Sequence, residues 1–169
     1  MGVHHVSWHA IASGVEDEIV VASALSWLVG SDDLVEIETT DSYHGSKFSV
    51  ITSHINNKRK ATDSLSRLGV EVLEEVLRTI DERLDEEKTL HIRLDMIDLI
   101  SGKLKLKYSE NRPSIKGKTK LEVYPGDDVG KVAEETIKKA INDALNLRLP
   151  EKSEDILTRS YMHVHVRVS

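Results

Sequence analysis

The stretch VHHVSWHAIA, Val3–Ala12, decides how the N-terminal part of this chain folds. Its apolar and polar residues alternate: one set comprises Val6, Trp8, Ala10 and Ala12, and the other comprises His5, Ser7 and His9. Successive side chains of a β-strand point to opposite faces of the sheet. The pattern therefore predicts a strand that places one face against an apolar core and presents histidines on the other.

Strands and helices follow this first strand without a regular alternation. Ser13 and Glu16 have the spacing of a capping box, which predicts a helix that ends at Gly30. Alternating patterns predict strands over 34–39, 47–55 and 90–94, and three-and-four spacing predicts helices over 56–68, 70–84 and 129–145, with a short helical turn capped by Asp95. This order favours an α+β fold, a mainly antiparallel sheet with helices packed on one face.

A lysine-rich segment, Lys103–Lys120, lies between the predicted helical turn at Asp95 and the predicted helix over 129–145. It has a local charge of +6, with Glu110 as its one acid, inside a chain of net charge −6. Its cations alternate with other residues, which predicts two β-strands separated by a turn at Arg112-Pro113. Its lysines are Lys103, Lys105, Lys107, Lys116, Lys118 and Lys120.

The sheet face opposite the helices is then expected to carry these lysines together with His91 and Arg93. A polar, basic and open sheet face is suited to a polyanion, and nucleic acid is the polyanion we favour. A second explanation stays open at this point, because exposed strands also carry lysine to stay soluble and to avoid pairing at their edges.

Two further segments are candidates for nucleic-acid contact. Lys58, Arg59 and Lys60 open a predicted helix, where free N–H groups and the helix dipole attract anions. His44 follows Tyr43 in a predicted loop, where both rings could touch a base or a sugar. We therefore include Lys58, Arg59, Lys60 and His44 in the predicted site.

Length and composition bound the remaining possibilities. The 169 residues predict one domain over 1–145 and a C-terminal extension over 146–169. In the extension, Met162–Val168 alternates as a further strand that could pair with a second copy of the chain. The absence of cysteine, and of any signal peptide or membrane-spanning stretch, predicts a cytoplasmic protein without a membrane partner.

Catalytic and metal-binding motifs are missing from the sequence. It has no HExxH motif, no nucleophile elbow and no phosphate-binding loop, so we expect a non-enzyme without a metal or cofactor. Aromatic residues make up 4% of the chain, and the lysine-rich segment lacks the interleaved aromatics that stack bases. Backbone contacts to structured or duplex RNA therefore fit better than the reading of single strands.

Several segments together resemble a small archaeal family described as RNA-binding and as a predicted exosome subunit. They are, in chain order, VHHVSWHA at 3–10, EDE at 16–18, YHG at 43–45, NNKR at 56–59, HIRLD at 91–95 and LEVYP at 121–125. The resemblance covers roughly Val3 to Leu145. It implies a fold similar to the ribosomal protein that holds 5S ribosomal RNA, a role in RNA processing or translation, and no known catalytic activity.

Three hypotheses follow from the sequence. The first is a non-catalytic RNA-binding protein that uses the open sheet face and the basic helix start. The second is an interaction or dimerisation module of an RNA-processing complex such as the exosome, which would use the C-terminal strand. The third is a metal-dependent nuclease, suggested only by the eight histidines.

Overall fold

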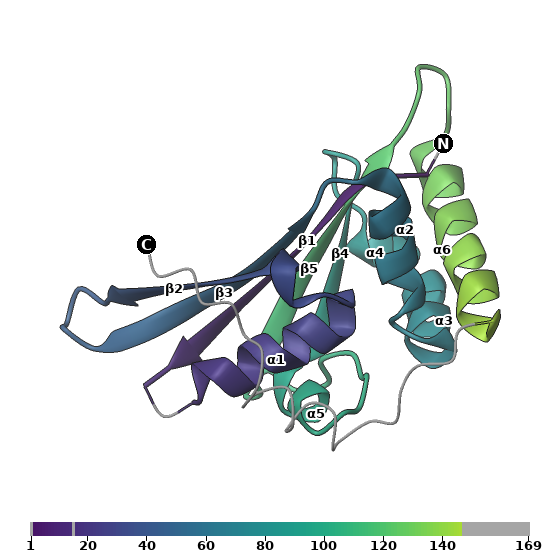
Figure 1. The fold of residues 1–169 in the computed structure, drawn as a ribbon. Coiled ribbons are helices and arrows are strands. Elements are labelled where there is room, and N and C mark those ends of the chain that lie inside the picture. Colours follow the sequence, from purple (N-terminus) through teal and green to yellow (C-terminus); the bar gives the residue numbers. More distant parts are fainter. Residues whose placement is uncertain (1, 15, 147–169) are drawn as a thin grey trace.

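Strand β1 (Gly2–Ser13) lies at the centre of a five-stranded antiparallel sheet with the strand order β2-β3-β1-β5-β4 (Figure 1). The computed structural model describes residues 2–14 and 16–146. The other strands are β2 (Val35–Asp41), β3 (Lys47–Ile55), β4 (Thr89–Asp95) and β5 (Ser114–Glu122). The helices are α1 (Glu18–Val29), α2 (Lys58–Ser66), α3 (Val70–Arg78), α4 (Ile80–Arg83), α5 (Met96–Ile100) and α6 (Val129–Asn146), with a 3-10 turn at Asp32–Leu34.

The apolar face of β1 forms the middle of the core, as its alternation predicts. Val6, Trp8, Ala10 and Ala12 are all buried, and a register irregularity between Val3 and His5 allows Val3 to face the core as well. Trp8 pairs with Gly117 of β5, and a Cβ atom at Gly117 would lie 2.4 Å from the indole ring. The glycine in the lysine-rich segment therefore makes room for the tryptophan of the neighbouring strand.

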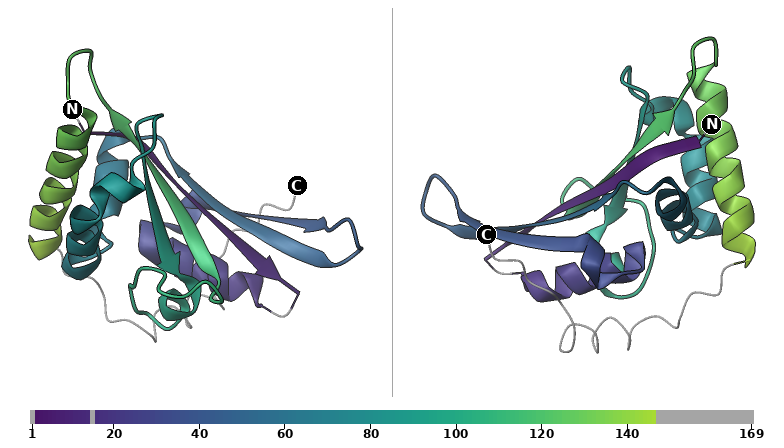
Figure 2. Two further views of the ribbon diagram at one scale, coloured as in Figure 1. Left: turned by 180° about the vertical axis from the view of Figure 1, so that it is seen from behind. Right: turned by 45° about the horizontal axis from the view of Figure 1, so that its top comes forward.

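Helices cover only one face of the sheet. Figure 1 looks onto the helices, and the left view of Figure 2 looks onto the uncovered face, which we call the open face. Helices α2, α3 and α6 pack together over one end of the sheet, and α1 lies against β1, β2 and β3. The predicted α+β fold with helices on one face is confirmed.

The hairpin of β2 and β3 extends away from α2, α3 and α6 (Figure 1). Its turn at residues 42–46 therefore lies far from α2, α3 and α6. Strand β3 runs from this turn to the start of α2, and its bounds match the predicted strand over 47–55.

Three local predictions need correction. Glu16 does bond to the N–H of Ser13, but the cap of α1 is Asp17, whose carboxylate accepts from the N–H of Ile19 at 2.9 Å. The predicted helix over 70–84 divides into α3 and α4 at Thr79. The predicted strand at Lys103–Lys107 is no regular strand, since its pairing is limited to a single bridge between Leu106 and Leu94.

The predicted C-terminal strand, Met162–Val168, lies outside the described residues, as do most of the residues of the predicted extension. No helix in the described ranges 2–14 and 16–146 is long and apolar enough to cross a membrane.

Candidate nucleic-acid interface

The register of the sheet brings the predicted basic residues of β4 and β5 side by side. Arg93 pairs with Lys116, and His91 pairs with Lys118. Directly paired residues of an antiparallel sheet project from the same face, so these four side chains form one cluster on the open face. The rows continue across β1 and β3 as Arg93–Lys116–His9–Thr52 and His91–Lys118–Ser7–His54.

The most available cations of this cluster are Arg93, Lys116 and Lys118. All three side chains are exposed, and none of them has an ion-pair partner among the described residues. Adjacent positions on one face of a strand are about 6.6 Å apart, so Lys116 and Lys118 present two closely spaced ammonium groups. Unpaired cations this close together repel each other and are stabilised by a bound polyanion.

Lys120 differs from the other two lysines of β5. It is half-buried, and its ammonium donates a hydrogen bond to the carbonyl oxygen of Glu87, in the turn before β4. The backbone N–H of Leu121 bonds to the carbonyl of Lys88 in the same turn, at 3.0 Å. Lys120 therefore helps to hold the turn and is less available to a ligand than Lys116 or Lys118.

The segment 103–108 runs along the outer edge of β4. The N–H of Lys107 donates to the carbonyl of Arg93 at 2.9 Å, and the N–H of Asp95 donates to the carbonyl of Lys105 at 2.9 Å. The side chains of Lys103 and Lys105 are exposed, whereas Lys107 is half-buried and pairs with Glu110 at 3.5 Å. The segment adds cations beside the open face, although it is not the second lysine strand that the alternation predicts.

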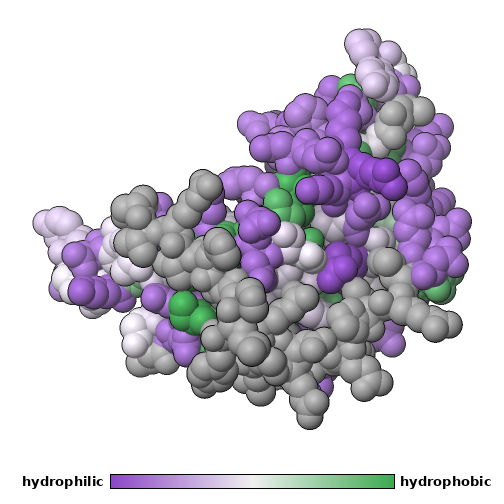
Figure 3. Space-filling view, in the orientation of Figure 1, coloured by the Kyte–Doolittle hydropathy of each residue, from purple (hydrophilic) through white to green (hydrophobic). Residues whose placement is uncertain are grey.

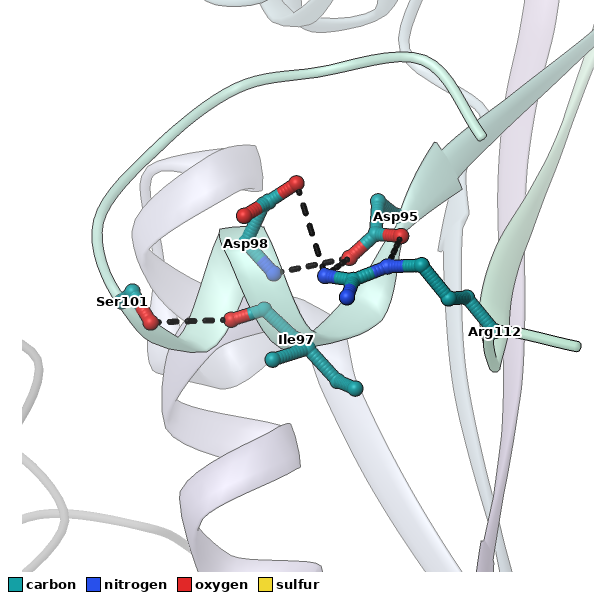
Figure 4. Close-up of polar contacts among 5 residues, drawn as sticks. All are labelled: Asp95, Ile97, Asp98, Ser101 and Arg112. Atoms are coloured by element: carbon teal, nitrogen blue, oxygen red, sulfur yellow. Dashed lines mark hydrogen bonds and ion pairs between the residues drawn. The ribbon is translucent and has the colours of Figure 1, made fainter. Parts of the chain in front are cut away.

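A buried ion pair fixes the path of this segment (Figure 4). The Asp95 carboxylate is fully buried and accepts from Nε of Arg112 at 2.5 Å and from Nη2 at 2.9 Å. It also accepts from the N–H of Asp98 at 2.9 Å and so caps α5 as predicted. The hydrogen bonds from Arg112 hold the pKa of Asp95 below its usual range. Arg112 is therefore a structural residue of the site.

His91 also has a protein partner. Its Nε2 lies 2.7 Å from a carboxylate oxygen of Asp85, and this hydrogen bond lowers the pKa of Asp85. The other carboxylate oxygen of Asp85 accepts from the N–H groups of Glu87 and Thr89. His91 is half-buried, and its hydrogen bond to Asp85, in the turn before β4, holds its ring in place on the open face.

The predicted basic helix start is present. α2 begins at Lys58, and Asn57 caps it by accepting from the N–H of Lys60 at 3.1 Å. Lys58 pairs with Glu122 at the end of β5, at 2.5 Å, and this contact raises the pKa of Lys58 and lowers that of Glu122. Arg59 and Lys60 are exposed and have no ion-pair partner among the described residues.

The helix start and the lysines of β5 are connected through Glu122. Glu122 follows Lys116, Lys118 and Lys120 at every second position, and it lies against Lys58. A groove between α2 and α6 begins here, with Arg59 and Lys139 among its cations and Asp63 and Glu135 among its acids. The helical side is mainly hydrophilic over α2 and α6 (Figure 3).

His44 lies apart from these cations. It is exposed in the turn of the β2–β3 hairpin, where its ring makes an edge-to-face contact with Tyr43 at 5.5 Å. The nine residues of β3 separate this turn from α2, a distance of about 30 Å along a strand. The structure therefore does not bring His44 together with Lys58 or with the lysines of β5.

Acidic residues occupy the other edge of the sheet, which the sequence analysis did not single out. Glu36 and Glu38 of β2 are exposed and pair with Thr52 and Val50 on the open face, whereas the exposed Asp41 belongs to the alternate set of β2 residues, on the other face. The open face therefore has a basic half on β4 and β5 and an acidic edge on β2. The alternation of Val35–Glu38 contains the signal, but the strand order is needed to show that β2 and β4 are opposite edges.

The described residues contain no group of three or more histidine, aspartate or glutamate side chains arranged to hold a metal ion. The four histidines that the register places on or beside the open face, His5, His9, His54 and His91, are spread over β1, β3 and β4. Burial and the neighbouring His4 and Lys120 lower the pKa of His5.

These features define a class of protein: an α+β domain whose exposed antiparallel sheet has a basic half suited to a polyanion. A family model described as RNA binding matches residues 5–121, and the chain belongs to this RNA-binding family. No curated protein matches the chain.

Solved structures of archaeal proteins share the fold. A DUF54 protein from Methanothermobacter thermautotrophicus is 27% identical, with a TM-score of 0.64 over 82% of this chain and 98% of the other. One from Archaeglobus fulgidus is 26% identical, with a TM-score of 0.63 over 81% and 99%. A UPF0201 protein from Methanococcus jannaschii, 13% identical with a TM-score of 0.54 over 79% and 98%, is similar in fold alone.

Proposed function

We propose that this protein binds structured or duplex RNA through the basic half of its open face and does not act as an enzyme. The observation that carries the proposal is the register that places Lys116 and Lys118 of β5 beside Arg93 and His91 of β4. Membership of the RNA-binding family supports RNA as the polyanion.

The chemistry of the face favours contacts to the RNA backbone. Ammonium and guanidinium groups pair with phosphates, which gives affinity but little sequence selectivity. No Phe, Tyr or Trp side chain occurs on β4 or β5, so this part of the sheet lacks the interleaved rings that single-strand-reading sheets use to stack bases. The acidic edge on β2 repels phosphates and so favours the β4–β5 half.

The test is a filter-binding assay with a short RNA hairpin. The double variant Lys116→Gln/Lys118→Gln removes two unpaired cations of the open face. The matched control, Lys131→Gln/Lys138→Gln, removes two exposed cations of α6, on the helical side. We expect the first variant to bind at least tenfold more weakly at low salt and the control to bind as the unmodified protein does. Equal affinity of all three proteins would contradict the proposal.

A role in RNA processing, including association with the exosome, rests on the family resemblance. The proposed likeness to the 5S RNA-binding ribosomal protein rests on the same resemblance, and the proposed absence of catalysis rests on it and on the missing catalytic motifs. Incubating the protein with labelled RNA, with and without a chelator, tests for cleavage. Chelator-sensitive cleavage would favour the nuclease hypothesis instead. The cytoplasmic location and the pairing of two copies through the C-terminal extension stay predictions from the sequence.

A further inference from the structure

A groove lies at the outer edge of β4. Its lining combines apolar side chains with charges of both signs, whereas the basic half of the open face presents cations. The groove has a volume of about 500 Å³ and lies between the turn after α4 and the segment 106–110. Both of these segments pair with β4, through the bridges Leu84–Leu90 and Leu94–Leu106. Leu84 and Leu106 are half-buried and line the groove, which gives it an apolar part.

Tyr108 lines the groove with an unusually exposed ring. Its side chain is 63% exposed, and the guanidinium of Arg112 lies 4.8 Å from the ring centroid. Arg112 is itself fixed by its two hydrogen bonds to the buried Asp95. One face of the ring therefore packs on an immobilised cation, which holds the ring in place. A fixed, exposed aromatic ring beside a groove is a surface on which a base can stack.

The charges that line the groove are balanced. Its cations are Arg83, Arg93 and Lys107, and its carboxylates are Glu82, Asp85 and Glu110. A phosphate gains little from such a lining, whereas an uncharged base has donors and acceptors for both kinds of group. The volume lies within the range of small-molecule sites, so the groove has room for one nucleotide and not for a duplex.

The groove is also continuous with the proposed RNA surface. Arg93 and His91 line it, and the same two residues pair with Lys116 and Lys118 on the open face. A duplex whose backbone contacts the two lysines therefore passes next to the groove. A nucleotide that leaves the duplex there can place its base against Tyr108 while its phosphate stays beside the exposed Arg93.

We propose that this groove is a subsite for one unpaired nucleotide, at the end of a duplex or in a bulge, whose base stacks on Tyr108. This inference rests on the proposed function, because it requires that RNA binds the open face. It gives the protein a preference among structured RNAs that backbone contacts alone do not supply.

The experiment compares two RNA probes that bind the full chain. One is a blunt hairpin, and the other is the same hairpin with a single unpaired 2-aminopurine nucleotide at its 3′ end. Tyr108→Leu removes the ring, Tyr108→Phe keeps it, and Tyr124→Leu is a matched control, because Tyr124 is also exposed but does not line the groove. Affinity and 2-aminopurine fluorescence are the two readouts.

We expect the unmodified protein to prefer the hairpin with the extra nucleotide and to quench its fluorescence. Tyr108→Leu should lose about tenfold in affinity for this probe and lose the quenching, with unchanged affinity for the blunt hairpin. Tyr108→Phe and Tyr124→Leu should behave as the unmodified protein. Binding of both hairpins with equal affinity, or unchanged quenching in Tyr108→Leu, would overturn the subsite and leave the proposed function standing. Failure to bind either hairpin would overturn both proposals.

Discussion

The two edges of the open face have the same backbone geometry and opposite charge. On β4 and β5, Arg93, Lys116 and Lys118 are exposed, whereas on β2 the exposed residues include Glu36 and Glu38. The net charge of the chain, −6, hides this division. The comparison teaches that the strand order determines the charge of each edge, because it collects the cations at one edge and the acids at the other.

The largest effect should come from breaking the ion pair that supports the basic half. Asp95→Asn removes the buried charge that Arg112 neutralises, so the melting temperature should fall by about 5 °C or more. Hydrogen exchange should become faster in the segment 103–113 and stay unchanged in the β2–β3 hairpin. Asp98→Asn is the control. An oxygen of Asp98 lies 3.6 Å from Nη2 of Arg112, but Asp95 accepts both hydrogen bonds of the guanidinium. Equal protection of the segment in both variants would contradict this role.

The same ion pair predicts how the stability of the fold changes with pH. The pKa of Asp95 is lowered in the fold, chiefly by Arg112, so the unfolded chain binds this proton more readily. The stabilisation is therefore complete above the ordinary aspartate pKa of about 3.9 and is lost as the pH falls below that value. Thermal unfolding of the unmodified protein and of Asp95→Asn should converge at low pH. A difference in melting temperature that grows on acidification would contradict the assignment.

Charge reversal tests whether the basic half can be converted into a second acidic edge. Lys116→Glu/Lys118→Glu should weaken binding of the RNA hairpin by on the order of 100-fold at low salt, because two phosphate contacts become repulsive. The slope of log K against log salt should also become less steep by roughly 1.8, about 0.9 for each of the two duplex phosphate contacts. Lys131→Glu/Lys138→Glu on α6 makes the same change of charge on the helical side and should change affinity far less.

A smaller effect is expected at the start of α2. Arg59→Gln removes one exposed cation beside the free N–H groups of the helix and should weaken hairpin binding by about fivefold. The control is Lys139→Gln, which removes a cation of the neighbouring groove that belongs to α6. If Arg59→Gln binds as the unmodified protein does, the RNA contact is confined to the sheet.

The smallest effect concerns the acidic edge. Glu38→Lys on β2 should strengthen hairpin binding by about twofold at low salt, because it removes a distant repulsion that salt screens. The gain should disappear at high salt. A weaker complex would mean that RNA does not approach the open face, or that the edge contributes in some other way than by charge.

Local pattern predicted much of the sheet. The alternation of β1 identified its buried face, the bounds of β3 were predicted as they are found, and Asp95 was recognised as a helix cap. These features depend on neighbours in the chain, so the sequence contains them. Alternation combined with an open face also placed Arg93 and Lys116 on the same face, although their direct pairing comes from the strand order.

The features that the sequence did not predict depend on contacts between residues that are far apart in the chain. Alternation made Lys103–Lys107 look like a strand, but the pairing of Arg112 with Asp95 and the bonds to β4 determine its path. Alternation likewise cannot show that the ammonium of Lys120 reaches the carbonyl of Glu87. Each of these contacts joins segments whose separation in space the sequence does not specify.

The most direct test of the central claim is lysine footprinting by acetylation and mass spectrometry, with and without the RNA hairpin. We predict that RNA protects Lys116 and Lys118, while Lys47 of the β2–β3 hairpin and Lys131 and Lys138 of α6 react as in the free protein. All five lysines are exposed, so each one reports on its own surface. Protection of Lys131 and Lys138 without protection of Lys116 and Lys118 would place the RNA on the helical side and contradict the account.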